Sequence, residues 1–249
     1  MMAVIGVMWL RQLKKYWRSR ARMIGALGQP LLFLVAFGFG FGPIFQKAGG
    51  GNYLEFLAPG IIAMSILFTA MFTGIEVIWD RQFGFLKETL VSPVSRYTIM
   101  VGRTLGGATV ATLQGIVVTV ISMLIGFKIM NLAMFPIALL FMFLIALMFT
   151  ALGTAIASRL EDMQAFPLIM NFLIMPLFFL SGALFPLEGL PKGLAIATRM
   201  NPLTYGVDGL RGVLVGGSHI GIMTDLLVVI AVAVFLSVLG GWLFSRIEI

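Results

Sequence analysis

Long uncharged stretches define the pattern of this chain. Runs without a single charged residue cover positions 23–46, 56–75, 104–127, 129–158, 163–187 and 226–245. About 20 apolar residues in a helix cross the roughly 30 Å hydrocarbon core of a bilayer, so each run is long enough to span it. The pattern therefore predicts an all-α integral membrane protein with six transmembrane helices.

The charged segments between these runs divide a single domain, residues 1–249, into consecutive parts. We place the transmembrane helices at about 23–46, 56–79, 98–127, 134–158, 163–185 and 224–245. Three other parts complete the plan: an interfacial helix at 4–22, a charged segment at 80–97 between the second and third spans, and a hairpin at 186–216 between the fifth and sixth.

The first of these parts has two distinct faces when it is drawn as a helix. One face is apolar and the other is basic, which is typical of a helix that lies in the headgroup plane of a membrane. The apolar face includes Trp9, Leu13 and Trp17, and the basic face includes Arg11, Lys14, Lys15 and Arg18. A simple membrane anchor and a contact with a cytosolic partner both remain open for this helix.

Composition agrees with a membrane protein, because 60% of the residues are hydrophobic and only 11% are charged. A soluble domain usually carries about twice that share of charge. The chain has no cysteine, which excludes disulfides and thiolate metal sites. We expect no metal centre in this protein.

The distribution of Lys and Arg predicts the orientation, since these residues are retained on the cytoplasmic side. With the amino terminus inside, five of the 17 lie outside, at positions 47, 128, 192, 199 and 211, and the other 12 lie inside. We therefore expect a multi-pass protein of the cell membrane with both termini in the cytoplasm. The same asymmetry accounts for the net charge of +7, so nucleic acid is not an expected partner.

The segment between the second and third spans, "DRQFGFLKETLVSPVSRYTIMVGR", is dense in charge, glycine and proline. Gly84 breaks the helix of the second span, and Pro93 ends the short helical stretch that follows. This arrangement predicts a short helix parallel to the membrane on its cytoplasmic side. An ordinary charged loop that fixes the orientation is the alternative.

The segment after the fifth span is apolar for an external loop. Asn201 followed by Pro202 is a start signal for a helix, and Asp208 and Arg211 can pair one turn apart on that helix. We expect two short helices that enter the outer leaflet and return, because polar backbone must be satisfied locally at that depth. An amphipathic loop on the surface is the alternative.

Three stretches carry a resemblance to the permease subunits of ABC-2 type exporters, the family that includes drug-resistance, nodulation-factor and polysaccharide export permeases. They are "LKETLVSPVSR" at 86–96, "FFLSGALFPLEGLP" at 178–191 and "NPLTYGVDGLRGVL" at 201–214. The resemblance implies a homodimer, or a heterodimer with a similar permease, that binds two copies of a separate ABC ATPase subunit. The chain has no Gly-rich loop ending in Gly-Lys-Ser/Thr, so ATP and Mg²⁺ are expected on that partner, with no cofactor on this chain.

The resemblance also assigns residues to roles. A coupling helix for the ATPase would use Arg81, Phe85, Leu86, Lys87, Glu88, Thr89, Leu90, Ser92, Pro93 and Arg96, together with the interfacial helix. An outer gate would use Gly182, Pro186, Asn201, Pro202, Tyr205, Asp208 and Arg211. The substrate would pass between two copies, and we place Phe37, Phe39, Phe41, Phe68, Phe72 and Phe172 along its path.

The resemblance favours an exporter of a hydrophobic or amphipathic substrate, such as a drug, a lipid or a glycan. A secondary transporter or channel with six spans and no ATPase is the main alternative. An enzyme is not expected, because the single histidine, His219, has no acidic residue near it in the sequence to orient it.

Overall fold

The computed structural model describes residues 2–47, 51–91, 94–160, 162–187 and 189–247. Its helices are α1 (Met2–Arg18), α2 (Arg20–Lys47), α3 (Tyr53–Phe72), α4 (Ile75–Gln82), α5 (Phe85–Val91), α6 (Arg96–Ile125), α7 (Phe135–Ala157), α8 (Ala165–Phe179), α9 (Lys192–Met200), α10 (Pro202–Val215) and α11 (Ile222–Ser245), with a 3-10 turn η1 (Leu132–Met134). The described residues contain no strand, so the predicted all-α class is confirmed.

Five helical segments in the described chain are long and apolar enough to cross a membrane. They are Arg20–Lys47, Tyr53–Gln82, Arg96–Ile125, Leu132–Ala157 and Ile222–Ser245. The fifth predicted span, 163–185, instead contains α8, a helix of 15 residues. The chain turns after α8 at Gly182, whose φ of 73° is the left-handed conformation that favours glycine. The predicted count of six spans is therefore not confirmed by helix length.

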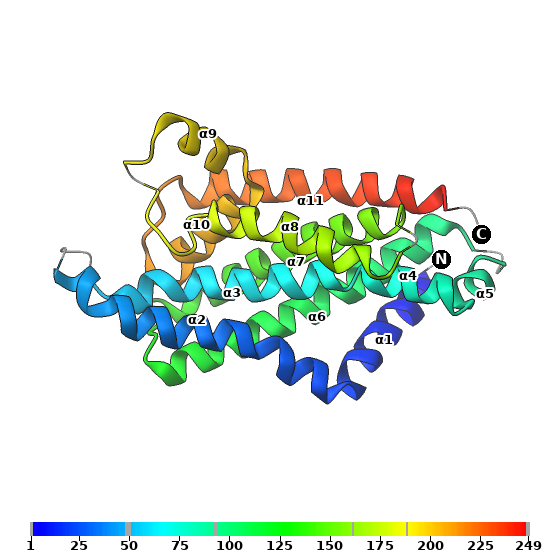
Figure 1. Ribbon diagram of the computed structural model, residues 1–249, viewed down its shortest axis with the longest axis horizontal. Coiled ribbons are helices and arrows are strands. Elements are labelled where there is room, and N and C mark those ends of the chain that lie inside the picture. The colour runs from blue at the N-terminus through cyan, green and yellow to red at the C-terminus, as the bar shows by residue number, and fades with distance from the viewer. Residues whose placement is uncertain (1, 48–50, 92–93, 161, 188, 248–249) are drawn as a thin grey trace.

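The helices form an elongated bundle in which α3 lies centrally (Figure 1). α3 packs against α2, α6, α7 and α10. In the crossing segment that begins with α3, 78% of the apolar stretch is buried inside the protein, against 11% for α2 and 17% for α11. α2 and α11 therefore turn most of their surface away from the rest of the chain.

Glycines allow the closest helix contacts in this bundle. A Cβ at Gly153 of α7 would lie 2.5 Å from the carbonyl oxygen of Met71 in α3. A Cβ at Gly74, which precedes α4, would lie 2.4 Å from the carbonyl oxygen of Gly153. Small residues at such crossings let backbones approach and increase van der Waals contact, which holds helices together in a membrane.

The amphipathic helix α1 packs against α6 rather than lying by itself at the surface. Trp9 Nε1 donates a hydrogen bond to Thr109 Oγ1 of α6 over 3.0 Å. A Cβ at Gly102 or Gly106 of α6 would lie 2.7 Å from side-chain atoms of α1, so both glycines are needed for the close approach. The helix expected over residues 4–22 also ends earlier than expected, at Arg18, and α2 begins at Arg20 in a new direction (Figure 1).

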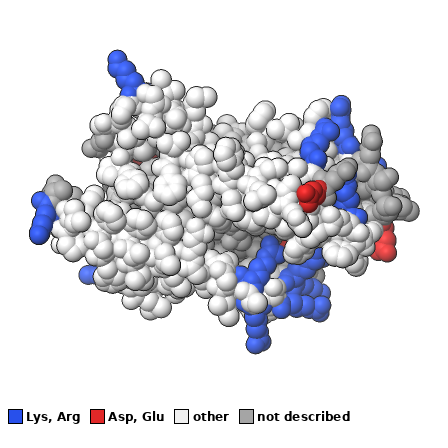
Figure 2. Space-filling view, viewed as in Figure 1, with Lys and Arg blue, Asp and Glu red and all other residues white. Residues whose placement is uncertain are grey.

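Charge gathers at one end of the bundle. α1 begins and α11 ends at that end, where α4 and α5 also lie (Figure 1). Figure 2 shows most of the Lys and Arg on the visible face at the same end, while the middle of the bundle is almost free of charge. This distribution is the one expected of a membrane protein whose basic end stays in the cytoplasm.

The Gly153 contact gives a first prediction. Gly153→Ala should lower the free energy of unfolding by about 1–3 kcal/mol, because the new methyl group overlaps a backbone carbonyl oxygen that cannot move by itself. Gly28→Ala in α2 is the matched control, since a Cβ there meets no atom within 4 Å. Thermal unfolding of the detergent-purified protein measures both changes. Equal stability of the two variants would contradict the close packing of α3 and α7.

Candidate functional site

Two carboxylates lie one helical turn apart near the charged end of the bundle. Glu76 and Asp80 both belong to α4, and their spacing of four residues places them on the same face of that helix. Only 3% of Glu76 and 5% of Asp80 is exposed. Buried carboxylates are stable only when cations or hydrogen-bond donors compensate for lost water, so their partners determine how this end of the protein is assembled.

Asp80 is paired with arginines from two other helices. Arg103 Nη1 of α6 lies 2.6 Å from Asp80 Oδ2, and the Arg103 side chain is 4% exposed. Arg11 Nη2 of α1 lies 3.0 Å from Asp80 Oδ1. One carboxylate therefore links α1, α4 and α6.

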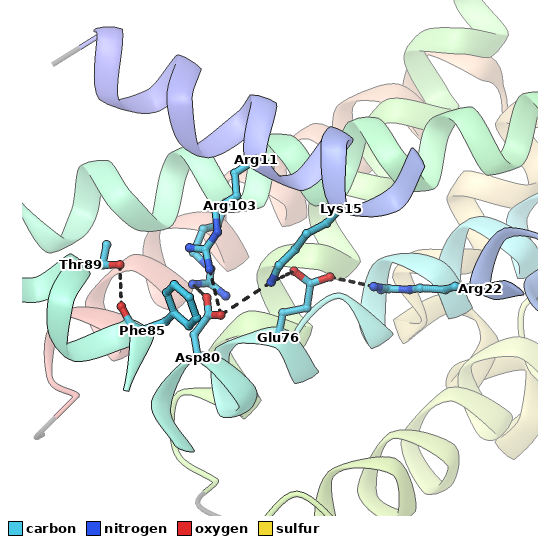
Figure 3. Close-up of polar contacts among 8 residues, drawn as sticks. All are labelled: Arg11, Lys15, Arg22, Glu76, Asp80, Phe85, Thr89 and Arg103. Atoms are coloured by element: carbon cyan, nitrogen blue, oxygen red, sulfur yellow. Dashed lines mark hydrogen bonds and ion pairs between the residues drawn. The ribbon is translucent and has the colours of Figure 1, made fainter. Parts of the chain in front are cut away.

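Glu76 extends the same network to α2. Arg22 Nη1 lies 2.8 Å from Glu76 Oε1, and Lys15 Nζ lies 3.4 Å from Glu76 Oε2. Lys15 also approaches Asp80, at 3.7 Å. We call Arg11, Lys15, Arg22, Glu76, Asp80 and Arg103 the ionic cluster (Figure 3). It contains four cations and two carboxylates.

The short helix α5 meets the ionic cluster through an aromatic ring. The guanidinium carbon of Arg11 lies 5.6 Å from the centroid of the Phe85 ring, within the range of a cation–π interaction. Leu86 is buried at 1% exposure, while Phe85 is 54% exposed. α5 is thus anchored on one side and presents part of its surface outward, and Arg11 contacts both Phe85 and Asp80 (Figure 3).

A second contact fixes α1 to α6. The Tyr16 hydroxyl donates a hydrogen bond to Gln114 Oε1, and Tyr16 is 5% exposed. Burial raises the pKa of Tyr16, which keeps the hydroxyl protonated. Together with Trp9, this residue holds α1 against α6 independently of the ion pairs.

The residues expected in the coupling segment lie in different surroundings. Thr89 donates to the Phe85 carbonyl oxygen within α5, and Glu88 is exposed. Arg96 begins α6 and donates to the carbonyl oxygens of Ser245 and Ile247, both over 2.9 Å, so it holds the end of α11. Arg81 lies in the last turn of α4. Ser92, Pro93 and the side chains of Lys87 and Leu90 lie outside the described part of the protein.

The two expected faces of α1 are only partly separated in the structure. Arg11 and Lys15 of the basic face turn toward the buried carboxylates, while Lys14 and Arg18 are exposed. Trp17 is 73% exposed, and Leu13 is half-buried. The cations of α1 thus divide into one pair used inside the protein and one pair left at its surface.

At the opposite end, the predicted start of α10 is confirmed. Asn201 Oδ1 accepts a hydrogen bond from the Leu203 amide over 3.0 Å, and Asn201 Nδ2 donates to the Leu177 carbonyl oxygen of α8 over 2.6 Å. Pro202 is the first residue of α10. Tyr205 donates to the Arg199 carbonyl oxygen over 2.9 Å, which joins α9 to α10. Pro186 is exposed in the turn after α8.

The expected pair of Asp208 and Arg211 is wrong, since these two described residues form no ion pair. Asp208 instead accepts hydrogen bonds from Ser218 Oγ and from the His219 and Ile220 amides. Arg211 donates to the carbonyl oxygens of Phe56 and Gly182, over 3.2 and 2.9 Å. Backbone groups from other segments compete successfully for both side chains, so the two residues connect α10 to its neighbours.

The six phenylalanines expected along a substrate path do not form one group. Phe68 and Phe72 stack on α3 and line a cavity beside α2. Phe37 and Phe41 stack on α2. Phe39 and Phe172 are 65% and 83% exposed on α2 and α8.

Comparison with known proteins identifies the family of this chain. The family model described as ABC-2 type transporter matches residues 3–215. The chain belongs to this family. Because the match begins in α1 and ends at the last residue of α10, it includes the ionic cluster and the helices at the opposite end.

Three relatives illustrate the family. The ycf38 protein of Pyropia yezoensis, named as a transport permease, is 31% identical over 81% of this chain and 70% of its own length. Nodulation protein J of Rhizobium leguminosarum bv. trifolii is 29% identical over 80% and 77% of the two chains. The inner membrane transport permease YadH of Escherichia coli is 25% identical over 92% and 90%. The chain is thus similar to transport permeases, and its family is that of ABC transporter membrane subunits.

Sequence reasoning found the helices of this site and missed the site itself. The sequence pattern places Glu76 at the end of the second span and Asp80 at the start of the charged segment, and it counts Arg22 and Arg103 only among the cytoplasmic cations. The sequence does contain one signal of this site. Two carboxylates four residues apart at the end of an apolar helix need cations or hydrogen-bond donors that compensate for lost water. Two of their partners, Arg22 and Arg11, lie 54 and 69 residues earlier in the chain, and no local pattern identifies them.

The ionic cluster gives a second prediction. Asp80→Asn should lower the free energy of unfolding by about 3–5 kcal/mol, because it leaves the buried Arg103 guanidinium without its counter-charge. Glu88→Gln removes the same type of charge from an exposed position and should change stability by less than about 1 kcal/mol. Denaturation of both purified variants under identical conditions gives the comparison. A small effect of Asp80→Asn would show that the pair with Arg103 is not formed.

Proposed function

We propose that this chain is the permease subunit of an ATP-driven ABC exporter, and that α5 with α1 transmits the movement of separate ATPase subunits to the transmembrane helices. The contact of Arg11 with both Phe85 and Asp80 carries this proposal. A partner that displaces α5 acts on Arg11, and through Asp80 on Arg103. The motion therefore reaches α1, α4 and α6 together.

The buried ion pairs suit such a role. An exposed ion pair contributes little and breaks easily, whereas breaking the buried pair of Asp80 and Arg103 leaves uncompensated charge. Separating the helices that the ionic cluster joins would break these buried pairs, so we expect these helices to move together. Arg22 brings α2 into the same unit through Glu76.

In this proposal the charged end faces the cytoplasm, with both chain termini, and the protein is a multi-pass protein of the cell membrane. The concentration of Lys and Arg at that end supports the orientation. The ATPase would be present in two copies and would hold ATP and Mg²⁺. Its contact surface would include the exposed parts of α5, which carry Phe85 and Glu88.

The permease would act as a dimer, either of identical chains or with a similar permease. The aromatic surfaces of α2 and α8 support this part of the proposal, because Phe39 and Phe172 are 65% and 83% exposed on them. A hydrophobic or amphipathic substrate, such as a drug, a lipid or a glycan, would pass between the two copies, and α9 and α10 would shape the outer exit.

The coupling role gives a third prediction. Phe85→Ala should reduce the ATPase activity that co-purifies with the permease by about tenfold or more, because the ring that links α5 to Arg11 is lost. The change removes no buried charge, so the free energy of unfolding should change little. The measurement is ATP hydrolysis by the complex isolated from native membranes through a tag on this chain, normalised to the amount of permease.

Phe235→Ala is the matched control, since this ring is 64% exposed in the middle of α11, a helix that packs against α6, α7 and α10. It should leave the associated ATPase activity unchanged. If no ATPase accompanies the wild-type chain, or if Phe85→Ala behaves like the control, the coupling role fails. A secondary transporter or channel without an ATPase then becomes the better description.

A further inference from the structure

A cavity of about 370 Å³ lies between α1, α2 and α3, beside the ionic cluster. Pro30, Met64, Phe68 and Phe72 form much of its apolar wall, and Arg22 lies at its charged end. This combination of one long apolar wall and one cation distinguishes the cavity from a simple packing defect, which would be lined by apolar groups alone.

The residues of α2 that line the cavity lie within the depth of one membrane leaflet. Arg22 and Pro30 are eight residues apart on α2, which corresponds to about 12 Å along a helix. This distance is less than half of the roughly 30 Å hydrocarbon core. A molecule bound here would hold its polar part at the level of α1 and its apolar part toward the middle of the bundle.

The charge of the surroundings favours an anion at the Arg22 end. The adjoining ionic cluster has four cations and only two carboxylates, so its net charge is positive before any ligand binds. Arg22 uses Nη1 for Glu76, while a guanidinium offers five N–H donors in a planar fork that fits phosphate oxygens. One third of the Arg22 side chain is exposed.

Two polar groups in the cavity wall lack the partners that a helix normally supplies. Ser65 is 2% exposed, and its hydroxyl has no hydrogen-bond partner among the described residues. Hydroxyls elsewhere in the bundle, such as those of Thr119 and Ser122, bond to the carbonyl oxygen four residues earlier. Pro30 has no amide hydrogen, so it cannot donate to the carbonyl oxygen of Ala26, which also lines the cavity.

From these observations we propose that the cavity binds an amphiphile with a phosphate headgroup, with the phosphate at Arg22 and a single apolar chain along Pro30, Met64 and Phe68. The chemistry fits a phospholipid of the membrane and a phosphate-bearing substrate equally well. The proposal rests on the cavity and its charge and is independent of ATPase coupling, so either proposal can fail without the other.

Binding of two probes with the same chain tests the headgroup. Oleoyl lysophosphatidic acid carries a phosphate monoester, and monooleoylglycerol carries the same acyl chain with no phosphate. Native mass spectrometry of the detergent-purified chain, titrated with each probe, gives the two affinities. The phosphate probe should bind about tenfold or more tightly, and Arg22→Gln should reduce its affinity by a similar factor. Arg22→Lys should retain part of that affinity.

Filling the cavity tests the location without removing any charge. Gly25 lines the cavity, and a Cβ there meets no atom within 4 Å, so the first carbon of a leucine at this position has room. Gly25→Leu is the first filling variant. Ala26→Leu is a second filling variant. Gly28→Leu is the matched control, because Gly28 also has open space around it and is not part of the cavity wall. The filling variants should lose at least tenfold in affinity for the phosphate probe, and the control should not.

Equal affinity for the two probes, or unchanged binding in both filling variants, would overturn the proposal. The source of the amphiphile follows from lipids retained during purification. One phospholipid per wild-type chain, absent from Gly25→Leu, would support the site and identify a membrane lipid. An empty wild-type chain that binds the added phosphate probe would also support the site and would identify a substrate-type ligand.

Discussion

The buried carboxylate of Asp80 is the constraint on which the charged end of this protein depends. Removing a charge from water costs several kcal/mol unless other charges and donors surround it, and Asp80 meets this demand with arginines from two different helices. The requirement is stricter than apolar packing, because apolar side chains can shift while a buried charge must keep its partner. These ion pairs therefore hold α4 against α1 and α6, in addition to the packing of α1 on α6, and Arg11 also contacts the short helix α5.

The opposite end is held by different chemistry. Arg211 and Asp208 bind backbone carbonyl and amide groups, and Asn201 connects the start of α10 to the end of α8. These contacts join short segments that cannot cross a membrane, and they satisfy the polar groups of turns at the end of an apolar bundle. Between the two ends, close contacts at Gly74 and Gly153 align α3 and α7. The molecule thus combines ionic contacts at one end, close backbone packing in the middle and hydrogen-bonded turns at the other end.

The sequence predicts the helices well and the contacts between them poorly. Uncharged runs indicate α6, α7 and α11 nearly at their observed positions, and Asn201 with Pro202 marks the start of α10 because capping is a local effect. The length of α8 could not be predicted, since the turn at Gly182 lies inside an apolar run. The pairing of Asp208 with Arg211 was wrong because the amides that bind Asp208 belong to a turn ten or more residues away. The partners of Asp80 are equally non-local.

The order of the ionic cluster along the chain has a consequence for how the protein is made. Arg11, Lys15 and Arg22 all precede Glu76 and Asp80, and a chain is synthesised from its amino terminus. The cations that neutralise the two acids are therefore already present when α4 leaves the ribosome, whereas Arg103 arrives later with α6. The acidic helix can enter the membrane beside existing counter-charges and is then locked by the last arginine.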